Sequence, residues 1–113
     1  MTARSVFCRL PGPLACQGVE LQRLHAAGQV WLLAWDLGRL PALSPWVARQ
    51  RDPSIIGRRL RIEGGNMHPR LAFTLPVVQQ MALMCRGPAA QALFELVSAE
   101  IEAGRHFFPE RLE

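Results

Sequence analysis

Lysine is absent from this chain: all thirteen of its basic residues are arginines. Charged residues of any kind are also scarce, at 19% of 113 residues, while half are apolar, and this balance excludes an intrinsically disordered chain. No apolar run reaches the roughly 18 residues that a membrane-spanning helix needs, since the densest run, residues 30–35, ends at Asp36. The N-terminus also lacks an apolar stretch long enough for a signal peptide. We therefore expect a soluble, cytoplasmic protein.

Cysteine is scarce too, with three residues in the chain: Cys8, Cys16 and Cys85. Their odd number and their spacing fit neither a disulfide framework nor a metal or redox motif, which indicates a reducing compartment. Buried, unreactive thiols are favoured over a reactive one. At 113 residues the chain is long enough to bury one core without crosslinks, so we expect a single domain over residues 1–113.

The positive charge is concentrated in the middle third of the chain. Residues 39–70 hold seven arginines against two acidic residues, an excess of five positive charges. Residues 95–113 hold five glutamates and two arginines, an excess of three negative charges. This asymmetry indicates one side that faces a polyanion and another that is turned away. The lack of lysine fits either a GC-rich genome or selection for guanidinium chemistry, and composition does not separate the two.

Alternation of apolar residues predicts β-structure in the first third. We expect a short strand over residues 6–10, then a hairpin that turns at Gly28 between residues 19–25 and 29–34. Asp36 is the expected N-cap of a short helix that Pro41 ends.

The middle and the end of the chain follow with turn signals and helical periodicity. A helix is expected over residues 45–51, and a second hairpin from the alternation in residues 59–63 and around Leu71 and Phe73. Thr74 is the expected cap of a helix that begins at Leu75, and a last helix runs from Pro88 to about Gly104. The predicted fold class is α+β, with small antiparallel β-hairpins packed on a C-terminal helical hairpin.

The second hairpin supplies the candidate nucleic-acid interface. If its strands pair, Arg59, Arg61 and Arg70 are expected to share the solvent face. Neighbouring arginines complete the candidate set: Arg49, Arg51, Arg58, Arg59, Arg61 and Arg70. A two-stranded ribbon fits a major groove, and a guanidinium group binds guanine or phosphate. A charged outer face is also what any one-sided antiparallel sheet displays, so both readings stay open.

The two C-terminal helices resemble a helix–turn–helix, but their charge argues against DNA reading. The second helix is expected to expose Glu95, Glu100 and Glu102, which phosphates would repel, so a core-forming helical hairpin is favoured. The three tryptophans are interpreted as core anchors rather than base-stacking side chains: Trp31, Trp35 and Trp46.

The residue pattern predicts no enzyme. Three histidines lie far apart, and none accompanies a serine or cysteine in a catalytic signature: His25, His68 and His106. The glycines at 64 and 65 lack the context of a phosphate-binding loop and fit a hairpin turn. A metal site built from Cys85 and a histidine has no support from spacing. We therefore expect no catalytic residue, no metal and no cofactor.

Two stretches carry a resemblance to a known family. Residues 30–37 (VWLLAWDL) and residues 86–97 (RGPAAQALFELV) are similar to the strand-and-helix start and to the last helix of the N-terminal domain of the BRO family, which includes phage antirepressors. The likeness runs from about Val6 to Gly104, with Leu96 where the family tends to carry tryptophan. The resemblance implies DNA binding or interference with a DNA-bound regulator, and no catalytic residue.

Two functions follow as expectations. The first is a DNA-associated regulator of phage or mobile-element type that uses the arginine set. The second is a protein-interaction module, an antirepressor or inhibitor, that binds a regulatory protein through its helical side. A homodimer is a further expectation, because Val77, Leu83 and Met84 lie off the main apolar stripe of their helix.

Overall fold

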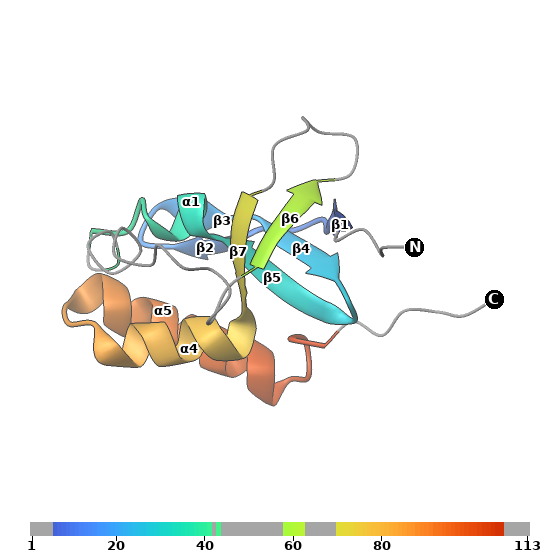
Figure 1. The fold of residues 1–113 in the computed structure, drawn as a ribbon. Coiled ribbons are helices and arrows are strands. Elements are labelled where there is room, and N and C mark those ends of the chain that lie inside the picture. Colours follow the sequence, from blue (N-terminus) through green and yellow to red (C-terminus); the bar gives the residue numbers. More distant parts are fainter. Residues whose placement is uncertain (1–5, 42, 44–57, 63–69, 108–113) are drawn as a thin grey trace.

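The structure is a computed structural model that describes residues 6–41, 43, 58–62 and 70–107, with residues 6–9 and 58–62 described by their backbone alone. Five strands close into a small barrel in the order β1-β4-β5-β7-β6 (Figure 1). In that order their bounds are Val6–Arg9, Arg23–Ala26, Gln29–Leu33, Arg70–Thr74 and Arg58–Ile62. Neighbouring strands are antiparallel except β1 and β6, whose parallel pairing closes the barrel.

A separate hairpin and three helices complete the described fold. Strands β2 (Leu14–Cys16) and β3 (Val19–Leu21) pair with each other, and α1 (Ala34–Leu37) follows β5 directly. Helix α4 (Leu75–Met84) continues from β7, and α5 (Pro88–Glu102) packs against α4 below the barrel (Figure 1). The predicted α+β class, with hairpins on a C-terminal helical pair, is confirmed. Within the described residues, the helices are all too short or too polar to cross a bilayer.

The first predicted hairpin is confirmed, with one correction. Strands β4 and β5 turn through Ala27 and Gly28, whose φ angles of 53° and 75° are those of a two-residue turn of the type that matches strand twist. Residues 19–25 are not one strand, however, because the chain breaks at Gln22 into β3 and β4. The break has a physical cause: the Gln22 backbone N–H donates to the Asp36 carboxylate, at 2.9 Å, rather than to a neighbouring strand.

The core has two parts, one on each side of the barrel wall. Inside the barrel lies a small cluster of buried residues: Leu24, Ala26, Trp31, Leu33 and Ala72. Outside it, a larger cluster joins the strands to the helices, with Leu32 and Phe73 packed among residues such as Met81, Leu93 and Val97. Strand β5 contributes to both clusters because its successive side chains point to opposite faces.

The predicted start of α4 is confirmed, but neither predicted N-cap residue caps its helix. Helix α4 begins at Leu75 with Pro76 in its first turn, as predicted, but the Thr74 side chain makes no capping hydrogen bond. Asp36 is not an N-cap either, because α1 begins at Ala34 and includes Asp36.

Helix α5 ends in a Schellman arrangement in which Gly104 has a φ of 77°. The Arg105 N–H donates to the Glu100 carbonyl, at 2.8 Å, and its guanidinium binds the Glu100 carboxylate at 2.8 and 3.0 Å. Glu100 is therefore buried and paired, and the prediction that it is exposed is wrong. Glu95 and Glu102 are exposed as predicted.

The two described tryptophans, Trp31 and Trp35, differ in burial. Trp31 is buried inside the barrel, and its indole N–H donates to the Ala26 carbonyl at 2.8 Å, as expected of a core anchor. Trp35 is 70% exposed, so its assignment to the core is wrong. The other residues of α1 face inward, which leaves Trp35 as the residue of this short helix that points to solvent. Trp46 and the helix predicted over residues 45–51 lie outside the described residues.

Cys16 forms no disulfide. Cys16 is buried beside α5, and burial raises the pKa of its thiol, which keeps it protonated and unreactive. This agrees with the expectation of a structural thiol for Cys16.

Phe73 anchors the outer core, so its truncation tests the packing of the helices on the barrel. Its side chain is fully buried in the cluster shared with α4 and α5. We expect Phe73→Ala to lower the free energy of unfolding by about 3–5 kcal/mol, measured by urea denaturation. The control is Leu83→Ala, at a side chain that is 61% exposed, which should change stability by less than about 0.5 kcal/mol. Equal losses of stability in the two variants would contradict this packing.

Candidate nucleic-acid interface

The arginine-rich segment forms the hairpin that its alternation predicts. Strand β6 carries three arginines in five residues, and β7 begins with a fourth, so the two paired strands hold four arginines: Arg58, Arg59, Arg61 and Arg70. The remaining members of the predicted set, Arg49 and Arg51, lie outside the described residues.

The register of this hairpin corrects the prediction of one shared arginine face. Directly paired residues in an antiparallel ladder share a face, and successive residues alternate. Arg59 pairs with Leu71, whereas Arg70 pairs with Leu60. Position 59 is therefore on the outer side of the barrel wall, and position 70 is on the inner side. Alternation within each strand does not fix the register between strands, and a shift of one residue between strands reverses the face of a whole strand.

Arg70 nonetheless reaches solvent, because it is the first residue of β7 and lies at the end of the barrel. Its side chain makes no hydrogen bond or ion pair with any other described residue. Three other arginines are engaged in the fold. Arg23 donates to the carbonyls of Pro11 and Gly12, Arg39 pairs with Asp36, and Arg105 pairs with Glu100. Arg70 is therefore available to bind an anion.

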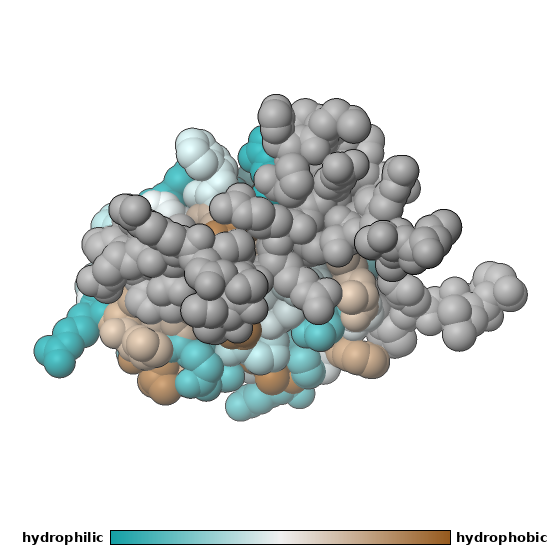
Figure 2. Space-filling view, in the orientation of Figure 1, coloured by the Kyte–Doolittle hydropathy of each residue, from teal (hydrophilic) through white to brown (hydrophobic). Residues whose placement is uncertain are grey.

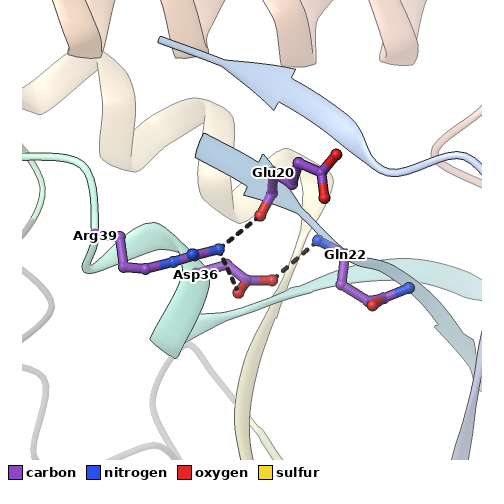
Figure 3. Close-up of polar contacts among 4 residues, drawn as sticks. All are labelled: Glu20, Gln22, Asp36 and Arg39. Carbon is purple, nitrogen blue, oxygen red and sulfur yellow. Dashed lines mark hydrogen bonds and ion pairs between the residues drawn. The ribbon is translucent and has the colours of Figure 1, made fainter. Parts of the chain in front are cut away.

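A buried carboxylate fixes α1 at the same end of the barrel (Figure 3). Asp36 is 7% exposed, and one of its oxygens accepts the Gln22 backbone N–H at 2.9 Å. The other oxygen accepts from the Arg39 guanidinium at 3.2 Å, and the same Arg39 nitrogen donates to the Glu20 carbonyl at 2.9 Å. These contacts tie α1 to the junction of β3 and β4, so the orientation of the helix is set by groups inside the protein.

Trp35 is an exposed aromatic side chain on α1, at the same end of the barrel as Arg70. Helix α1 contacts β7, and Figure 1 shows it beside the start of that strand. An aromatic face next to cationic side chains is a common feature of surfaces that bind nucleic acid. Sequence reasoning missed Trp35 because residues 30–35 form one continuous apolar run, and nothing in that run separates Trp35 from its buried neighbours.

The acidic helix lies away from the arginine hairpin. Glu95 and Glu102 are exposed on α5, and Figure 1 shows the helical pair below the barrel and β6 in the upper part of the barrel wall. The apolar sides of α4 and α5 are buried in the outer core, which confirms a core-forming helical hairpin. Among the described side chains, Glu95 and Glu102 are therefore exposed on the helical side and Arg70 is exposed on the hairpin.

Within the described part of the chain, no three His, Cys, Asp or Glu residues come close enough together to hold a metal ion. His68 lies outside that part. Comparison with family models, with curated proteins and with solved structures found no match to this chain.

Removal of the Asp36 carboxylate tests whether it holds α1 in place. We expect Asp36→Ala to lower the free energy of unfolding by about 1–3 kcal/mol, because the partly buried Gln22 N–H and the Arg39 guanidinium lose their acceptor. Amide exchange at Gln22 should accelerate in the same variant. Glu20→Ala is the matched control, since Glu20 contributes its backbone carbonyl and not its side chain. Unchanged exchange at Gln22 in Asp36→Ala would rule out the proposed anchor.

Proposed function

We propose that this protein is a small DNA-associated regulator, of phage or mobile-element type, that binds nucleic acid through the arginines of the β6–β7 hairpin. The observation that carries the proposal is Arg70, which is exposed at the end of the barrel and free of any partner among the described residues. It belongs to a hairpin with four arginines in ten strand residues. Guanidinium groups match the geometry of phosphate oxygens and remain charged at any physiological pH.

The positions of the exposed glutamates also favour the hairpin side as the binding surface. The exposed glutamates of α5 lie on the helical side, so a nucleic acid on the hairpin would not have to approach them. A polyanion is attracted to the positive side and oriented by the negative one, which favours binding in a single orientation.

The resemblance to the BRO family N-terminal domain adds a second, independent argument. It rests on residues 30–37 and 86–97, which correspond to the end of β5 with α1 and to the first part of α5. DNA binding or interference with a DNA-bound regulator would follow from that family.

A protein-interaction module is the second candidate, and exposed apolar residues on α4 favour it. Leu83 and Met84 are 61% and 71% exposed at the end of this helix, while Val77 packs partly against the core. Figure 2 shows apolar surface among polar surface on the helical side of the molecule. Exposed apolar side chains of this kind suit a regulatory protein or a second copy of the chain. A complex with a protein partner and no nucleic acid would favour this function.

Charge reversal in β6 tests the nucleic-acid proposal. We expect Arg59→Glu and Arg61→Glu, singly and together, to weaken binding of a labelled duplex and of a labelled single strand in titrations at several salt concentrations. The slope of log affinity against log salt should fall by roughly 0.7 to 0.9 for each phosphate that the variant no longer neutralises. Arg86→Glu, at an exposed arginine in the turn between α4 and α5, is the control that matches each single variant in its change of charge.

The control should bind nearly as well as the unchanged protein. Absence of binding to either nucleic acid at low salt would refute the proposal. Equal weakening by Arg86→Glu would show that net charge, and not the hairpin, is responsible.

A further inference from the structure

Trp35 is held in an exposed position that the protein itself stabilises. Its neighbours Ala34, Asp36 and Leu37 are buried, while Trp35 is 70% exposed. The Asp36 contacts to Gln22 and Arg39 hold the helix, so a rotation of α1 that turned the indole inward would break these partly buried hydrogen bonds. The protein therefore presents a large aromatic surface to solvent on a rigid support.

Trp35 and Arg70 lie at the same end of the same strand pair. Strands β5 and β7 run antiparallel, and the last pair at this end joins Leu33 to Ala72. Trp35 is two residues beyond Leu33, and Arg70 is two residues beyond Ala72 in the opposite chain direction. Helix α1 also contacts β7, so the two elements that carry Trp35 and Arg70 are neighbours at one rim of the barrel.

The combination of an exposed tryptophan with a nearby arginine favours single-stranded over double-stranded nucleic acid. An indole stacks on the face of a base, and an arginine beside it binds the phosphate of the same strand. The faces of bases inside a duplex are covered by their neighbours, whereas an unpaired base offers its face at little cost. A ribbon that reads a major groove would use arginines and would have no role for an exposed tryptophan.

We infer that this protein binds single-stranded nucleic acid at the rim formed by Trp35 and Arg70, with an unpaired base stacked on Trp35 and a phosphate held by Arg70. The inference rests on the proposed function, since it specifies the form of the nucleic acid that the arginine hairpin binds. It assigns Trp35 a role in affinity that does not depend on charge, and Arg70 a role that does.

The test is a fluorescence anisotropy titration of the full chain with a labelled oligothymidine of about ten nucleotides, and with a labelled duplex of the same length. The single strand should bind more tightly than the duplex. Trp35→Ala should weaken binding of the single strand by about five-fold or more without a change in the salt slope. Trp35→Phe should restore much of the affinity. Arg70→Ala should weaken binding and lower the salt slope by about 0.7.

Two controls separate stacking from a general disruption of the fold. Leu83→Ala removes an exposed apolar side chain from the helical side and should leave the affinity unchanged. Intrinsic tryptophan fluorescence should be quenched when oligothymidine is added to the unchanged protein, and the quenching should be smaller in Trp35→Phe, where Trp31 and Trp46 are still present.

The outcomes distinguish this inference from the proposed function. If neither nucleic acid binds, both are wrong. If the duplex binds as tightly as the single strand, or if Trp35→Ala binds the single strand as well as the unchanged protein while Arg59→Glu and Arg61→Glu do not, the single-strand inference is wrong and the arginine hairpin stands. Preference for the single strand, together with weaker binding by Trp35→Ala that phenylalanine restores, supports the inference.

Discussion

Burial of β5 on both of its faces is the constraint on which the rest of the structure depends. Val30 and Leu32 pack outward under the helices, and Trp31 and Leu33 pack inward with Leu24 and Ala72. A strand with two buried faces needs cover on both sides. The closed barrel covers one face, and the α4–α5 pair covers the other, so the helical hairpin is required by the core rather than added for recognition. Parallel pairing of β1 with β6 completes the ring.

The end of β5 shows how this constraint shapes the surface. The chain leaves the barrel wall after Leu33 and turns into α1, where Asp36 becomes buried. A buried carboxylate is costly unless it is paired and hydrogen-bonded, and Asp36 has both kinds of partner in Arg39 and the Gln22 N–H. The same contacts end β3, orient α1 and turn Trp35 outward beside the start of β7. The contacts of Asp36 thus link the end of β3 to the exposure of Trp35 at this rim.

Much of the fold was predictable from local patterns. The turn at Gly28, the two strands of the second hairpin, the start of α4 at Leu75 and the limits of α5 follow from period-two or helical spacing and from Gly and Pro signals. These features depend on residues close together in the chain, which is why sequence patterns contain them.

The errors concern contacts between distant residues. The break at Gln22 and the inward side chain of Asp36 depend on each other across fourteen positions. Burial of Glu100 depends on the turn that brings Arg105 back to it. The face of Arg70 depends on the offset between two strands, and the exposure of Trp35 depends on the burial of its neighbours. Alternation within one strand contains none of this information, so the candidate arginines could be named from sequence but not arranged.

We propose that nucleic acid binds at the rim near α1 and at the β6–β7 hairpin, and not at the acidic helix α5. Backbone amide chemical-shift mapping during titration with a single-stranded oligonucleotide separates these surfaces. We expect the largest changes at α1 and at the start of β7, a shift of the Trp35 indole signal with them, and no change at the amides of α5 around Glu95. Largest changes on α5, or no changes at any oligonucleotide concentration, would contradict this proposal.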